Sequence, residues 1–132
     1  MAHKTLFKVA EVQLTYKFKY KFAERPIIAS SKEAYEIFLS QWSLGRIGFL
    51  EESKLILLNR RNSVLGIVDI SMGGISGTVV DPKVIFVIAL KAGASAIILA
   101  HNHPSEKLNP SPQDIILTKK IKEGVSYWTL KY

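Results

Sequence analysis

The sequence has no cysteine among its 132 residues, which excludes disulfides and thiolate metal sites and leaves nitrogen and oxygen as the metal ligands. Long apolar runs are also missing, because stretches such as Ala94 to Ala100 fall far short of the roughly 20 residues of a membrane-spanning helix. The first residues, Met1 to Thr5, include no apolar signal core. We therefore expect a cytoplasmic protein that does not associate with a membrane.

Acidic residues are fewer than basic ones, with 11 Asp and Glu against 18 Lys and Arg, so the net charge is +7. Such a balance favours binding to polyanions such as nucleic acid by counterion release. Many domains are basic without binding nucleic acid, so the net charge alone does not decide whether nucleic acid is a partner.

The length predicts a single domain with a real core, since 48% of the residues are hydrophobic. Between residues 12 and 22, apolar side chains alternate with Thr15 and three lysines, which predicts a long, half-exposed strand. The lysines either contact phosphate or protect an outer strand from aggregation. We expect residues 1–27 to form an N-terminal strand extension and residues 28–132 the main domain.

Helices and strands are predicted in a clear order. Ser30 and Glu33 form a capping box that begins a helix whose apolar face carries Tyr35, Phe38, Leu39 and Trp42. Two strands, 55–58 and 64–70, follow as a hairpin. Asp81 and Pro82 begin a helix that is apolar on a wide face and therefore predicted to be buried. A central buried strand at 95–100 precedes a last helix that begins at Ser111 and stops at Gly124. The fold class is thus α/β or α+β, with a mixed sheet flanked by helices.

The most informative segment is His101-Asn102-His103-Pro104, directly after the central strand. Side chains at i and i+2 of an extended segment share a face, so His101 and His103 can bind one ion while Asn102 points away. Asp114, in the first turn of the next helix, supplies a third ligand if that helix folds back over the histidines. Three protein ligands and one position for water make a catalytic zinc site, so we expect Zn²⁺ as the cofactor.

Simpler explanations exist for the same residues. Ser111 and Asp114 together form a capping box, which accounts for both without a metal, although a cap and a ligand are compatible. A lone histidine is more often a packed or solvent-facing residue than a ligand. Two histidines at strand spacing, followed by a carboxylate, make that explanation less favoured than metal binding.

A hydrolase of this type also needs a carboxylate as general base. Glu51 and Glu52 stand at the start of the first hairpin strand. Alternation allows only one of them to share the side of Leu55 and Leu57. The alternative is that both are simply solvated.

The spacing of His101, His103, Ser111 and Asp114 resembles the metal-binding motif of the JAB/MPN metalloprotease superfamily, the JAMM motif, at every position. Two segments are similar to the RadC-like proteins of bacteria, residues 97–105 and residues 51–59. The resemblance covers roughly residues 47–124.

The resemblance implies a JAB/MPN, cytidine deaminase-like fold in which His101, His103 and Asp114 bind zinc. It implies that Ser111 hydrogen-bonds the developing oxyanion or positions the water, and that Glu51 is the general acid/base, with Glu52 as the alternative. The implied reaction is hydrolysis of amide or isopeptide bonds in a protein or peptide substrate by zinc-activated water. RadC-like proteins also carry a historical DNA-repair label.

The sequence departs from the family pattern in three places. Ser53 stands where the family usually has an aromatic residue, two positions after the glutamate. The segment 125–132 does not match the Asp-His strand that usually follows the last helix, so we expect a domain truncated at its C-terminus. The alternatives are that a partner chain completes its sheet, as in a homo-oligomer, or that its own N-terminal strand does. The helix-hairpin-helix segment of longer RadC-like proteins is absent.

Three hypotheses follow, of which a zinc metallopeptidase ranks first. The second is a non-catalytic MPN-type binding module for a protein or DNA partner. A metal-dependent nuclease ranks last, because two-metal nucleases need several clustered carboxylates.

Overall fold

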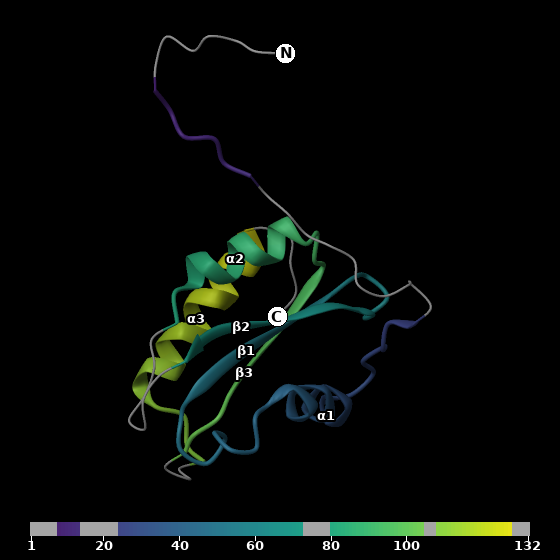
Figure 1. Cartoon of the computed structure of the whole chain (residues 1–132), viewed down its shortest axis with the longest axis vertical. Coiled ribbons are helices and arrows are strands. Elements are labelled where there is room, and N and C mark those ends of the chain that lie inside the picture. Colours follow the sequence, from purple (N-terminus) through teal and green to yellow (C-terminus); the bar gives the residue numbers. More distant parts are fainter. Residues whose placement is uncertain (1–7, 14–23, 73–79, 105–107, 128–132) are drawn as a thin grey trace.

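The computed structural model describes residues 8–13, 24–72, 80–104 and 108–127. These residues form a three-stranded sheet with helices on both faces (Figure 1). Strand β1 (Glu52–Leu58) lies in the centre, between β2 (Val64–Met72) and β3 (Ala96–His101). Both pairings are antiparallel, so the α+β class is confirmed, while the expected mixed sheet has no parallel pair among the described strands.

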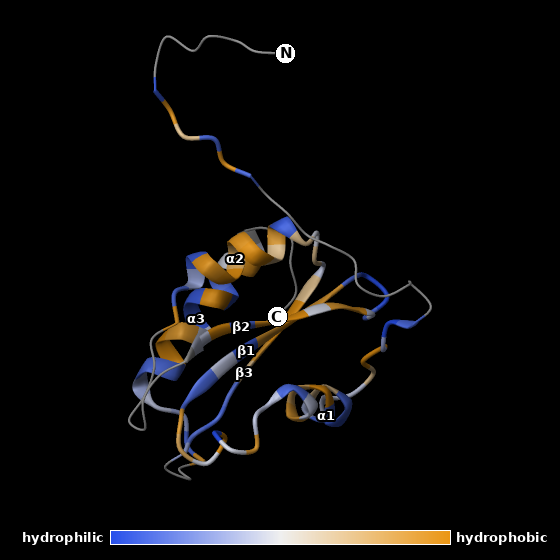
Figure 2. Ribbon diagram, in the orientation of Figure 1, coloured by the Kyte–Doolittle hydropathy of each residue, from blue (hydrophilic) through white to orange (hydrophobic). Residues whose placement is uncertain are grey.

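Two hydrophobic cores share the central strand, because its side chains alternate between the faces. Leu55 and Leu57 pack toward α2 (Pro82–Lys91) and α3 (Pro112–Tyr127). Ile56 and Leu58 pack on the other face, toward α1 (Ser31–Gln41). Figure 2 shows apolar residues along the three strands where the helices cover them. The sheet is therefore fixed from both sides.

The predicted helix starts are confirmed. The Ser30 hydroxyl accepts from the backbone N–H of Glu33 at 3.3 Å, and the Glu33 carboxylate accepts from Ala29 N–H. Asp81 caps α2 by accepting from Lys83 N–H at 2.9 Å, with Pro82 as the first helical residue. These side chains satisfy backbone donors that have no partner within a first helical turn.

Two expectations about the helices are wrong. Gly124 does not stop the last helix, which continues to Tyr127, because this glycine is a packing position beside the ring of Phe86. Helix α2 is buried on one side only: Ile85 and Ala89 are buried, while Val87 is 58% exposed. An apolar sequence is thus not sufficient for complete burial.

The long strand predicted for residues 12–22 lies outside the described residues apart from residues 12 and 13, which form no regular element. Within the described chain, the helices are too short or too polar to cross a bilayer.

Candidate metal centre

The end of strand β3 places two imidazole rings side by side. His101 is the last residue of β3 and pairs with Ser53 of β1. His103 follows two residues later, and its Nε2 lies 2.8 Å from Nε2 of His101. The ring centroids are 4.7 Å apart. The two histidines therefore face one point, as their spacing predicts.

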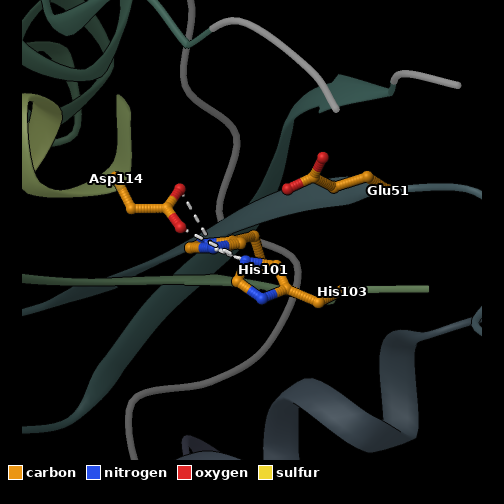
Figure 3. Close-up of side chains that lie close together, drawn as sticks. All are labelled: Glu51, His101, His103 and Asp114. Carbon is orange, nitrogen blue, oxygen red and sulfur yellow. Dashed lines mark hydrogen bonds and ion pairs between the residues drawn. The ribbon is translucent and has the colours of Figure 1, made fainter. Parts of the chain in front are cut away.

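The first turn of α3 brings Asp114 against both rings. Its Oδ1 lies 3.3 Å from Nε2 of His101, and its Oδ2 lies 3.2 Å from Nε2 of His103. The three side chains are 18% to 27% exposed, so solvent reaches them. Figure 3 shows the carboxylate spanning the two nitrogens. The helix thus folds back over the histidines.

Ser111 fixes the orientation of this carboxylate. Its backbone N–H donates to Oδ2 of Asp114 at 2.8 Å, and its hydroxyl accepts from Asp114 N–H at 3.1 Å, which is a reciprocal capping box. Burial alone raises the pKa of the Asp114 carboxyl, but the hydrogen bonds from Ser111 and the neighbouring His101 and His103 outweigh it. The net effect is a pKa below the ordinary value, so the carboxylate form is favoured.

Glu51 is the fourth member of the cluster. Ligand atoms of Glu51, His101, His103 and Asp114 all lie within 4.8 Å of one another. In Figure 3, Glu51 and Asp114 approach the histidines from opposite sides. The side chains of this group come from three separate parts of the chain.

Glu52 points to the other face of the sheet. Its side chain is 3% exposed, and its Oε1 accepts from Nε of Arg46 at 2.9 Å. The hydrogen bond to this carboxylate, together with its charge, raises the pKa of the Arg46 guanidinium. Lys54 Nζ lies 3.7 Å from the second carboxylate oxygen. Glu52 is therefore held in a buried ion-pair network away from the histidines.

A cavity of about 200 Å³ lies beside the cluster and includes Glu51, His101 and Asp114 in its wall. Ser53, which is buried, also lines it. Gln113 and Lys120 of α3 complete one side. These two residues were not predicted as site residues, because neither lies three or four positions from Asp114 on the helix.

A larger cavity of about 730 Å³ lies between α1 and β3, and His101 and Asn102 are among its lining residues. Tyr35 and Leu39 line it too, which explains why Tyr35 is 62% exposed although it shares a helical face with buried Phe38.

The donor set fits a zinc ion. Ligands placed tetrahedrally at ordinary Zn–N and Zn–O distances are about 3.3 Å apart. The nitrogen–oxygen separations of 3.3 Å from His101 to Oδ1 and 3.2 Å from His103 to Oδ2 are close to that value, although they involve the two different oxygens of Asp114, and the nitrogen–nitrogen separation of 2.8 Å is shorter. Two imidazoles and a carboxylate are ligands that zinc accepts in catalytic sites. His101, His103 and Asp114 can therefore hold the ion.

A sequence profile of RadC-like JAB domains matches residues 28–131. Among curated proteins, a UPF0758 protein of Flavobacterium johnsoniae is 45% identical over 95 residues, or 72% of this chain and 40% of that protein. A UPF0758 protein of Clostridium tetani is 34% identical over 116 residues, 87% of this chain and 50% of that protein. One from Synechocystis is 37% identical over 112 residues, 83% and 45% respectively. This chain thus spans about half the length, or less, of these relatives.

Proposed function

This chain belongs to the family of RadC-like JAB domains, and from that premise we propose that it is a zinc-dependent hydrolase that cleaves amide or isopeptide bonds in a protein or peptide substrate. The observation that carries the proposal is the convergence of Glu51 with His101, His103 and Asp114 within 4.8 Å. Three of these side chains are suited to hold a metal, and the fourth is a carboxylate beside it.

Zinc is the metal that we propose, because the site combines imidazole nitrogen with carboxylate oxygen. A zinc ion held there would polarise the scissile carbonyl and lower the pKa of a water molecule to about 7. Proton transfer and the orientation of the metal ligand are the tasks of the protein's own side chains.

Glu51 is the general acid/base in this proposal. Its carboxylate accepts a proton from the attacking water and delivers it to the leaving amine nitrogen. Glu52 is a poorer candidate, since Arg46 and Lys54 hold its carboxylate on the opposite face of the sheet. Ser111 orients Asp114 by its cap, and its contact with the oxyanion, which the family pattern implies, stays a prediction.

The test separates metal binding from turnover. The purified chain is titrated with Zn²⁺ in competition with a chromophoric chelator, and turnover is measured on a mixture of quenched fluorescent peptides. We expect one bound zinc per chain, which His103→Ala abolishes together with turnover. Glu51→Gln should keep the zinc and lower kcat by at least a hundredfold, because only the proton acceptor is removed.

Glu36→Gln is the matched control, since Glu36 is an exposed residue of α1, and it should change neither measurement. Unaltered zinc content in His103→Ala would contradict the metal site. Zinc binding without turnover on any peptide would instead favour a binding module, and full turnover in Glu51→Gln would require another base.

A further inference from the structure

Asn102 stands between the two histidines, yet its side chain bonds to backbone groups of residues outside the four clustered ones. It crosses instead to the segment that leads into β1. Its Nδ2 donates to the carbonyl oxygens of Ile47 and Leu50, both at 2.8 Å, and its Oδ1 accepts from the backbone N–H of Glu52 at 2.8 Å. All three partners are backbone groups about 50 residues away in sequence.

These partners enclose Glu51. The Leu50 carbonyl belongs to the peptide group that precedes Glu51, and the Glu52 N–H belongs to the peptide group that follows it. The backbone of Asn102 adds a longer contact from its N–H to the Glu52 carbonyl, at 3.4 Å. Both peptide groups beside Glu51 are therefore bonded to one residue.

Only a carboxamide of this length meets the requirement. A primary amide offers two N–H donors and a carbonyl acceptor, and here two carbonyls face the nitrogen while an N–H faces the oxygen. Aspartate keeps the acceptor but sets a negative charge against two carbonyl oxygens, and alanine removes all three bonds.

We infer that Asn102 is a positioning residue that sets the place of Glu51 relative to His101 and His103. This inference rests on the proposed role of Glu51 as the general base. Because Asn102 lies between the two histidines, one residue couples the metal-binding end of β3 to the segment that carries the base. Proton transfer depends on such placement, and displacement of a catalytic group by about 1 Å costs on the order of a hundredfold in rate.

The kinetic test uses Asn102→Ala and Asn102→Asp in the full chain, loaded with Zn²⁺ and assayed on the quenched fluorescent peptides. We expect kcat to fall at least tenfold, while KM and the Kd for Zn²⁺ stay within threefold. In a Glu51→Gln background, Asn102→Ala should produce no further loss, because Asn102 acts through Glu51. Additive losses would overturn the inference.

Asn59 supplies a matched control at the other end of β1. Its side-chain oxygen also accepts from backbone N–H groups, those of Arg61 and Ser63, far from the metal centre. Asn59→Ala should lower stability and leave kcat per folded molecule unchanged. An equal drop in kcat for Asn59→Ala and Asn102→Ala would mean that only general stability is affected.

Hydrogen exchange provides a measurement that needs no turnover. With Zn²⁺ alone present, Asn102→Ala should speed deuterium uptake in residues 46–52 and leave α2 unchanged. Unchanged uptake in residues 46–52, or a Kd for Zn²⁺ weakened more than tenfold, overturns the inference. If the wild-type chain turns over no peptide, the proposed function fails, while this exchange pattern still decides whether Asn102 holds the segment around Glu51.

Discussion

Alternation along the extended segment 101–103 gives three neighbouring residues two different tasks. His101 and His103 face Asp114, whereas Asn102 faces the carbonyls of Ile47 and Leu50. The same alternation separates Glu51 from Glu52 at the start of β1. The face on which each of these side chains lies therefore follows from the alternation that is common to any extended segment.

Ser111→Ala tests whether the cap of α3 also supports the metal centre. Loss of the capping hydroxyl should lower the free energy of unfolding by about 1 kcal/mol. It should also weaken Zn²⁺ binding by roughly tenfold, because the lost hydroxyl accepts from the backbone N–H of Asp114 and so helps to place this ligand residue at the start of α3. Urea unfolding and zinc competition measure the two effects.

Ser30→Ala is the control, since Ser30 caps α1 through the same kind of bond and is not one of the four clustered residues. It should cost a similar free energy of unfolding and leave the Kd for Zn²⁺ unchanged. If both variants bind zinc as tightly as the wild-type chain, Ser111 acts only as a helix cap.

Strand spacing groups His101 with His103, and Asp114 joins them if the next helix folds back, whereas Glu51 was added only through the family resemblance, with Glu52 as the alternative. The contacts of Asn102 were not predictable in this way. Its partners lie about 50 residues upstream, and no periodicity links a side-chain amide to three particular backbone groups. Only the folded arrangement of β1 beside β3 brings them together.

At the scale of elements, the packing of α2 on α3 explains why Gly124 lies inside α3 and does not end it. A Cβ built on Gly124 would overlap the ring of Phe86. From sequence alone, a glycine near a helix end indicates a C-cap. Here the helix continues because the missing side chain makes room for a neighbouring ring, a reason that is visible only once the two helices are paired.

Gly124→Ala should therefore destabilise the protein by about 1 kcal/mol. Alanine gains about 1 kcal/mol over glycine within a helix, but overpacking against the Phe86 ring costs about 1–3 kcal/mol. In a Phe86→Ala background the clash is gone, so the same substitution should raise stability instead. Chemical denaturation of the four proteins measures this change of sign.

Gly66→Ala in β2 is a useful comparison, because a Cβ there meets no atom within 4 Å. It should be neutral or slightly stabilising. Destabilisation by Gly124→Ala that persists without the Phe86 ring would show that the helix backbone, and not the contact with α2, requires glycine.

At the scale of the whole molecule, the fold and the metal centre rest on different residues. The two cores are built from apolar side chains of the sheet and helices, and none of the four clustered residues belongs to either core. The fold class was predictable because these cores follow from hydrophobic periodicity. The antiparallel pairing of β1 with β3 was not, since periodicity does not fix strand order.

This separation predicts that zinc stabilises the folded chain without being needed for folding. The apo protein should unfold cooperatively, because both cores are complete without a metal. At Zn²⁺ concentrations a hundredfold above Kd, binding adds about 2.7 kcal/mol to the free energy of unfolding, which corresponds to a rise in Tm of roughly 5–15 °C. Calorimetry with and without a chelator measures the shift, and His101→Ala should remove it while keeping a cooperative transition. A chain that is unfolded without zinc would instead make the ion part of the structural framework, and an unchanged Tm would argue against binding at this site.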